Sequence, residues 1–197
     1  TGTPMPANDS HRLPGIFISY RRSDTPDAVG RIYDRLIAEF GKSRVFKDVD
    51  SIPLGQDFRG HLNDIVGNCA AVLAIIGPKW TDIRSENGQR RLDDPDDFVR
   101  IELEAALARK VPVVPVLVGH AAMPATSQLP ASLSSLAFRQ AVDVRPDPDF
   151  HGDATRLVTA LRAIIDPNAP PVELHSGKPK SRGLPWLAAL AATATLA

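Results

Sequence analysis

Glu102 is the residue of this chain whose type and position could carry a reaction. It lies in a segment with the spacing of a helix, where 100° per residue places it on one face with Phe98 and Arg109. Its flanking residues on that face, Val99 and Ala105, are apolar. A carboxylate in an apolar arc is costly unless it is paired or opens into a cleft. Two interpretations follow: a functional carboxylate, or an ion pair with Arg109 or another base.

The second glutamate of the segment, Glu104, faces nearly the opposite side of the same helix. It stands four residues after Arg100, which is the spacing of an ordinary solvated ion pair. The helix that carries both glutamates is predicted to have Asp94 as its N-cap and Pro95 in its first turn, and to end near Lys110.

Other polar and aromatic residues are expected to surround Glu102. A carboxylate can stabilise the sugar cation that forms when a glycosidic bond breaks, and a pyridinium leaving group departs without needing a proton. Arginines can hold a pyrophosphate, and aromatic rings can stack on a base. Each candidate also has a structural interpretation, as a surface charge, a turn residue or a cover over the core. The candidate substrate-binding residues are Tyr20, Arg21, Arg22, Asp48, Trp80 and Phe98.

The elements that would position these residues alternate between strand and helix. Such alternation predicts a parallel sheet covered on both faces, and five strands favour a flavodoxin-like, three-layer α/β fold with strand order 2-1-3-4-5. In this order, the segments that follow strands one, two and three lie beside one crevice. The predicted strands are 16–20, 44–47, 70–76, 111–118 and 140–144, and the predicted helices are 25–40, one from 56, 94–110, a short one at 132–136 and a last one ending at 165.

Composition and motifs exclude several function classes. The 197 residues carry 23 basic and 23 acidic side chains, and zero net charge argues against a nucleic-acid binder. One cysteine, Cys69, excludes an intrachain disulfide, and five scattered histidines give no metal-ligand spacing. No Walker loop, glycine-rich dinucleotide motif or serine nucleophile elbow is present. A response regulator needs a phospho-accepting aspartate at the end of strand three. The predicted third strand ends in Ile75, Ile76 and Gly77 instead, which excludes that class.

The chain is predicted to consist of one domain with tails. Residues 1–13 are expected to be a disordered tail, 14–165 the folded domain, and 166–183 a linker rich in proline and lysine. Residues 184–197 are apolar but shorter than the roughly 20 residues that span a bilayer. They are interpreted either as the start of a transmembrane helix or as an alanine-rich tail. No secretory signal is visible, so the expected location is the cytoplasm, with anchoring through the C-terminal segment as the alternative.

Four motifs, in order, resemble the successive boxes of a bacterial Toll/interleukin-1 receptor (TIR) domain. They are IFISYRRSD, VFKDVDSIPLGQDF, FVRIELEAAL and VPVVPVLV, and the resemblance covers residues 14–165. It implies a flavodoxin-like domain that signals by self-association with other TIR domains. In many members of the family the domain also consumes NAD⁺, by hydrolysis or cyclisation.

The resemblance also implies roles for individual residues. The catalytic acid of the aromatic-x-x-x-Glu stretch corresponds to Glu102, with Phe98 where the family often has tryptophan. The first motif, by its resemblance to the family's first box, implies that Arg21 lies near the bound nucleotide. The loop from Asp48 resembles the one that lines the cleft and joins neighbouring domains, here through Pro53, Leu54 and Gly55.

The leading hypothesis from sequence is an NAD⁺ glycohydrolase or cyclase, activated by self-association, in bacterial antiviral defence or signalling. NAD⁺ is its substrate, and no cofactor, metal or nucleic acid is expected. The alternative is a noncatalytic adaptor that recruits other TIR domains, with Glu102 held in a structural ion pair. A third hypothesis uses the same carboxylate for deoxyribosyl transfer between nucleosides.

Overall fold

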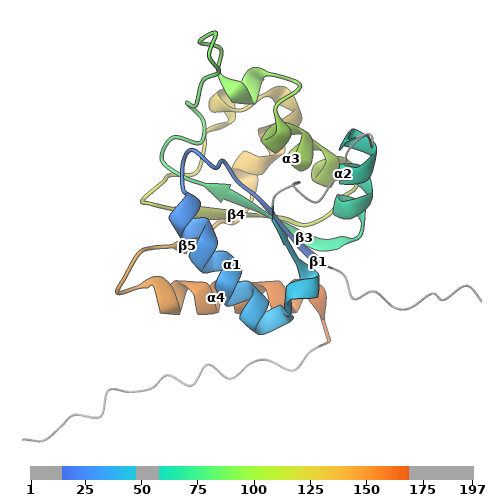
Figure 1. Ribbon diagram of the computed structural model, residues 1–197, viewed down its shortest axis with the longest axis vertical. Coiled ribbons are helices and arrows are strands. Elements are labelled where there is room, and N and C mark those ends of the chain that lie inside the picture. The colour runs from blue at the N-terminus through green and yellow to red at the C-terminus, as the bar shows by residue number, and fades with distance from the viewer. Residues whose placement is uncertain (1–14, 48–57, 169–197) are drawn as a thin grey trace, which may run out of the picture.

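The computed structural model describes residues 15–47 and 58–168. Their fold is built on a five-stranded parallel sheet (Figure 1). The strand order is β2-β1-β3-β4-β5, as predicted, so the flavodoxin-like topology is confirmed. The strands are β1 (Gly15–Ser19), β2 (Val45–Lys47), β3 (Cys69–Ile76), β4 (Val113–Val118) and β5 (Val142–Val144). The helices are α1 (Pro26–Phe40), α2 (Phe58–Gly67), α3 (Phe98–Ala108) and α4 (Phe150–Ile165), with a 3-10 segment at Ala131–Phe138.

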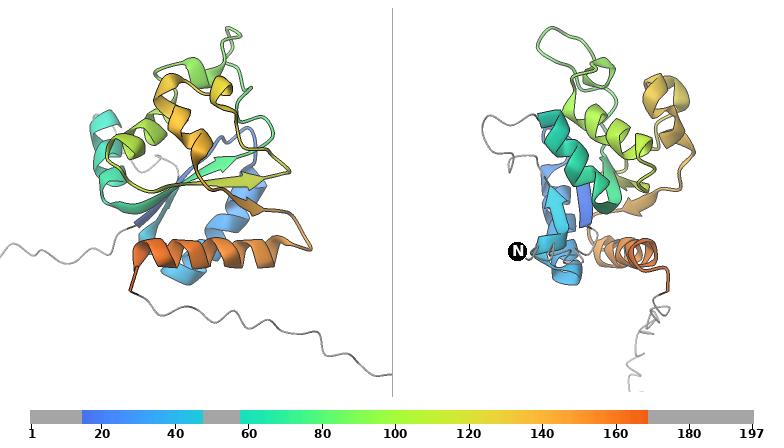
Figure 2. Two further views of the ribbon diagram at one scale, coloured as in Figure 1. Left: turned by 180° about the vertical axis from the view of Figure 1, so that it is seen from behind. Right: turned by 90° about the vertical axis from the view of Figure 1, so that its right-hand side faces the viewer.

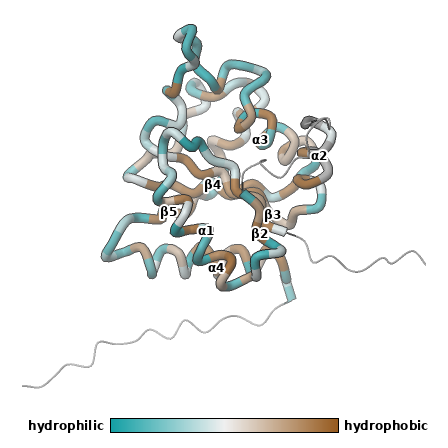
Figure 3. The backbone as a smooth tube through the Cα atoms, in the orientation of Figure 1, coloured by the Kyte–Doolittle hydropathy of each residue, from teal (hydrophilic) through white to brown (hydrophobic). Residues whose placement is uncertain are grey.

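Helices cover both faces of the sheet, with α1 and α4 on one side and α2 and α3 on the other (Figures 1 and 2). Successive residues of a strand point to opposite faces. In β1, Ile16 and Ile18 therefore join the core beside α1 and α4, whereas Phe17 joins the core beside α2 and α3. The central strands are correspondingly the most hydrophobic part of the fold (Figure 3). Alternate residues of β1 thus contribute to two separate hydrophobic cores, one on each face of the sheet.

Strand β4 contains Pro115 although it has neighbours on both sides. Proline cannot donate a backbone hydrogen bond, so it is disfavoured in a fully paired strand. Strand β5 pairs with β4 only from Val116 to Val118, which leaves the β5 side of β4 without a paired strand at Pro115. The predicted strand is confirmed, but it begins at Val113, just after Pro112.

Gly77, which directly follows β3, is required by the close approach of the segment after β1. A Cβ at this position would lie 2.3 Å from Asp24 Oδ2 and 2.4 Å from Thr25 Cγ2, at the start of α1. We expect Gly77→Ala to lower the free energy of unfolding by about 1–3 kcal/mol because these groups must be displaced. Gly30→Ala is the matched control: nothing lies within 4 Å, and alanine in a helix should raise stability by about 0.5–1 kcal/mol. Urea unfolding measures both, and equal effects would contradict the close-contact argument.

Asp153, near the start of α4, is a buried carboxylate held by arginines. It accepts hydrogen bonds from the backbone N of Arg145 at 3.0 Å and from Nε and Nη2 of the same residue at 2.8 and 2.9 Å, and Arg156 binds it as well. The side-chain hydrogen bond from Arg145 is the main reason that the pKa of Asp153 lies far below its usual value. This ion pair fastens the end of β5 to α4.

The depressed pKa of Asp153 predicts a loss of stability in acid. Above the ordinary aspartate pKa of about 4, the carboxylate is ionised in both folded and unfolded chains, and the full stabilisation is present. As pH falls below that value the unfolded chain takes up a proton first, so the stabilisation is lost on the way down to the folded-state pKa. The stability difference between wild type and Asp153→Asn should therefore shrink between pH 4 and pH 2. Urea titrations at several pH values measure it, and a constant difference would refute the ion-pair argument.

Candidate active site around Glu102

Helix α3, which carries Glu102, starts three residues later than the sequence suggested. Its N-cap is Asp97, whose Oδ1 accepts a hydrogen bond from the backbone N of Arg100 at 3.0 Å. The predicted N-cap, Asp94, instead accepts from the backbone N of Asp96 in a local turn. The predicted N-cap was wrong because several aspartates in the segment have similar capping propensity, and tertiary contacts select Asp97.

Glu102 is buried within the domain, with 6% of the residue exposed. Its neighbours in the helix, Val99 and Leu103, are buried in the core beside α2. Further along the same face, Arg109 lies against Gly67 at the end of α2, so this face of α3 is turned toward α2. The predicted inward orientation of Glu102 is therefore seen, whereas its catalytic role stays a prediction.

Glu104 shows the contrast that the helical wheel predicted. Its Oε1 accepts hydrogen bonds from Nε of Arg100 at 2.7 Å and from Oγ of Ser132 at 2.5 Å. Both glutamates are thus on one helix, but Glu104 is held at the partly exposed surface. It provides a natural control for experiments on Glu102.

Arg21 makes a buried ion pair with Asp97 instead of pointing into solvent. Its Nη1 and Nη2 donate to the two carboxylate oxygens at 2.9 and 3.0 Å, and only 2% and 1% of the two side chains are exposed. Its Nε also donates to the backbone O of Trp80 at 3.2 Å. The guanidinium therefore binds protein groups. This is a structural role, which differs from the predicted contact with the phosphates of a substrate.

The structure separates Tyr20 from the buried side of α3. Tyr20 is half-buried and packs against the core beside α1 and α4, in the layer opposite Glu102. The expectation that Tyr20 shares a pocket with Glu102 is not supported by this placement, because the alternation of β1 continues to Tyr20 and directs it to the same face as Ile16 and Ile18. Arg22 is exposed in the segment that follows β1, and its predicted phosphate contact stays a prediction.

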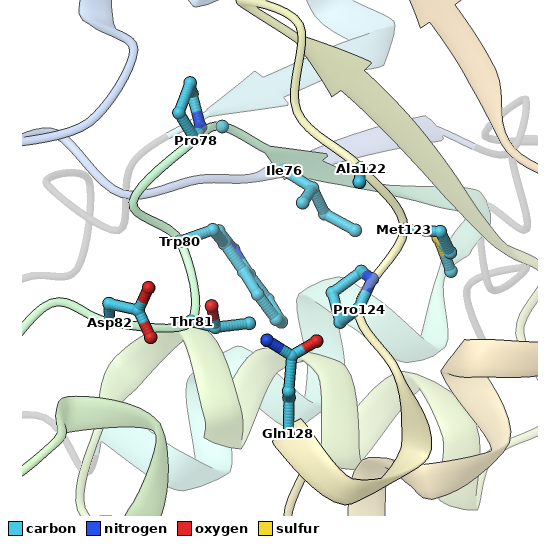
Figure 4. A pocket seen from close by; sticks show the side chains of 10 residues that line it. Ile76, Pro78, Trp80, Thr81, Asp82, Ala122, Met123, Pro124 and Gln128 are labelled. Atoms are coloured by element: carbon cyan, nitrogen blue, oxygen red, sulfur yellow. The ribbon is translucent and has the colours of Figure 1, made fainter.

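Trp80 is almost fully buried, in the core shared by α2 and α3. Its ring centroid lies 5.9 Å from Cζ of Arg21. Its ring also borders a cavity of about 170 Å³, with Pro124 and Met123 across from it (Figure 4). The sequence left open whether Trp80 lines a site or covers the core, and the structure shows it packed within the core.

Phe98 is the one predicted aromatic wall that is substantially open, with 53% of the residue exposed at the first position of α3. It stands one helical turn before Glu102, so an aromatic face and a buried carboxylate occur on the same side of the helix. Asp48 and the interaction-loop residues Pro53, Leu54 and Gly55 lie outside the described residues, and their predicted roles stay predictions.

Other chemistry receives no support from the parts of the chain that the structure describes. In those parts, no group of three or more His, Cys, Asp or Glu side chains could hold a metal ion. Burial raises the pKa of the Cys69 thiol to about 12, and its Sγ lies 3.2 Å from the backbone O of Ile65. A thiol with this pKa is a poor nucleophile at neutral pH. Among residues 15–47 and 58–168, no helix is long and apolar enough to cross a membrane.

Sequence reasoning missed Asp97 as an organising residue. The signal was present in the acidic run that precedes the helix, together with the arginine after the first strand, but nothing local distinguishes Asp97 from its neighbours. Only the fold brings Arg21 to it across 76 positions of sequence.

Comparisons with known proteins agree with this architecture. The TIR domains of the activated Roq1 resistosome, which directly recognises the pathogen effector XopQ, match with a TM-score of 0.52 and 15% sequence identity. The match covers 75% of this chain and 96% of that chain, and at this identity it shows a shared fold. No curated protein matches the sequence. A family model described as a TIR domain matches residues 16–158, and this chain therefore belongs to the TIR domain family.

Proposed function

We propose that this TIR domain cleaves the bond between nicotinamide and ribose in NAD⁺. The observation that carries the proposal is the placement of Glu102, a carboxylate buried on the α2-facing side of α3, with the exposed ring of Phe98 one turn away. A buried carboxylate is costly unless it is paired or opens into a cleft, and we infer that Glu102 borders the substrate cleft. Family membership makes NAD⁺ the substrate to test first.

The proposed reaction requires few protein groups. The glycosidic C–N bond breaks with its electron pair moving to the pyridinium nitrogen, which releases neutral nicotinamide and leaves a cation at the ribose anomeric carbon. The carboxylate of Glu102 stabilises this cation. Water then attacks and loses a proton to give ADP-ribose, or an atom within the molecule attacks to give a cyclic isomer.

Further contacts with the substrate are proposed for residues that are exposed at the surface. Arg22, an exposed residue, is proposed to contact the phosphates. Phe98 offers an open ring for stacking. Asp48 and the loop containing Pro53, Leu54 and Gly55 are proposed to complete the cleft.

Self-association is proposed as the activating event. The structural match is to the TIR domains of an activated resistosome. In this protein we propose that Pro53, Leu54 and Gly55 contact a neighbouring copy, that defence or signalling is the biological setting, and that the domain works in the cytoplasm. Nicotinamide release should then rise more steeply than in proportion to protein concentration.

A noncatalytic assembly module is the second candidate, favoured by apolar side chains at the surface. Phe138 is 82% exposed, and Phe46 on the edge strand β2 is also exposed. Exposed aromatic residues are typical anchors of protein interfaces. This candidate needs no turnover at Glu102.

Incubation of concentrated protein with NAD⁺, followed by chromatography for free nicotinamide and mass spectrometry of the second product, distinguishes the two. Release that depends on protein concentration supports the enzyme. A wild-type protein that forms oligomers in light scattering, yet releases no nicotinamide with crowding agents and across divalent ions, would instead support the assembly module.

A further inference from the structure

We propose that the buried Arg21–Asp97 ion pair positions Glu102 for the reaction, so that both residues are positioning residues of the active site; this rests on the proposed function. The pair joins the segment after β1 to the first turn of α3 through two hydrogen bonds of 2.9 and 3.0 Å. Both side chains are almost completely removed from solvent. A two-bond contact between a planar guanidinium and a carboxylate fixes orientation as well as distance.

Asp97 also connects the other segments at this edge of the sheet. Its Oδ1 caps α3 through the backbone N of Arg100 at 3.0 Å, and its Oδ2 lies 3.3 Å from Nε of Arg91. Arg21 in turn donates from Nε to the backbone O of Trp80, in the segment after β3. The loops after β1 and β3 are therefore tied to the N-terminus of α3 by a single carboxylate.

This arrangement acts on Glu102 through the helix. Glu102 follows Asp97 by five residues, which is about 7.5 Å along the helix axis. The hydrogen bonds between Arg21 and Asp97 fix the rotation of α3 about its axis and its position along that axis relative to β1. They therefore also fix the position of the Glu102 carboxylate. Misplacement of a catalytic group by about 1 Å can reduce a rate about a hundredfold, so a small shift of α3 matters to turnover more than to folding.

The chain offers a matched control in the opposite layer. Asp153 is likewise a buried carboxylate near a helix start, held by two hydrogen bonds from the guanidinium of Arg145. It belongs to α4, on the face of the sheet that Glu102 does not face. Loss of Asp153 therefore weakens the fold without moving α3.

The test compares Asp97→Asn with Asp153→Asn in steady-state nicotinamide release from NAD⁺. Asparagine is also a good N-cap, so Asp97→Asn removes the charge of the ion pair and keeps a capping group. We expect kcat to fall at least about tenfold with KM changed less than about threefold, while Asp153→Asn keeps kcat within about twofold. Circular dichroism identifies a temperature at which every variant is folded, and the kinetics are measured at that temperature.

Arg21→Lys provides a second variant in case Asp97→Asn does not fold. Lysine keeps the positive charge but cannot contact both carboxylate oxygens as a planar fork, so the same selective fall in kcat is expected. A folded Asp97→Asn or Arg21→Lys protein with wild-type kcat would overturn the positioning role alone. An inactive wild type would overturn the proposed function, and the positioning role with it. Equal losses in the Asp97 and Asp153 variants would show that the ion pair serves only stability.

Discussion

Glu102→Gln is expected to lower the rate of nicotinamide release by at least about a hundredfold while leaving the domain folded. Glutamine has nearly the shape of glutamate but no charge, so it cannot stabilise the ribosyl cation. Removal of one group that stabilises charge in a transition state typically costs a factor of about 10²–10³. Glu102 is buried, so its neutral replacement also avoids the cost of keeping a charge out of water. Nicotinamide chromatography measures the rate, and circular dichroism checks the fold.

Glu104→Gln is the control for this result. Glu104 contacts Arg100 and Ser132 at the partly exposed surface, and such ion pairs contribute about 0–1 kcal/mol. Nicotinamide release by Glu104→Gln should stay within about twofold of wild type. If Glu102→Gln releases nicotinamide at the wild-type rate, Glu102 is not the catalytic carboxylate. If Glu102→Gln is inactive yet still forms wild-type oligomers, catalysis and assembly are separate functions of the domain.

The sheet order and the presence of α1, α2, α3 and α4 between the strands followed from local patterns in the sequence. Apolar runs of strand length, separated by helical spacing, leave few topologies for a five-stranded parallel sheet. The helical wheel alone distinguished inward Glu102 from outward Glu104, because the direction of a side chain depends only on the 100° step along the helix. The Arg100–Glu104 pair was predictable for the same reason.

Residues whose roles depend on distant partners could not be placed in this way. The sequence offers Asp94 and Asp97 as similar caps, and the choice is made by Arg21, which comes from another part of the chain. Arg21 itself resembled a surface arginine after a strand. Its burial follows from Asp97 and from the backbone O of Trp80, which only the folded sheet brings together. The motif order likewise grouped Tyr20 with Glu102, although β1 directs Tyr20 to the opposite layer.

The Arg21–Asp97 pair should also show a large and asymmetric effect on stability. We expect Asp97→Ala to lower the free energy of unfolding by about 3–5 kcal/mol for two reasons. Among the described residues, the buried guanidinium of Arg21 would keep only the backbone O of Trp80 as a hydrogen-bond acceptor. Helix α3 would also lose its cap. Arg21→Met should cost less. Its partner Asp97 keeps Arg91 and the backbone N of Arg100, so the remaining charge is still compensated.

The double variant Arg21→Met/Asp97→Ala should be more stable than the sum of the single effects predicts. Once the arginine is gone, loss of the aspartate no longer strands a buried charge, since apolar replacement of both partners of a buried pair is often close to neutral. Urea unfolding of the four proteins gives the coupling energy, which we expect to be at least about 1 kcal/mol. The same cycle with Asp153→Ala and Arg145→Met should give a smaller coupling energy, because Arg145 is half exposed and can be hydrated when its partner is lost. A coupling energy near zero for Arg21 and Asp97 would mean that the two charges do not depend on each other, and the position of α3 would then not depend on this ion pair.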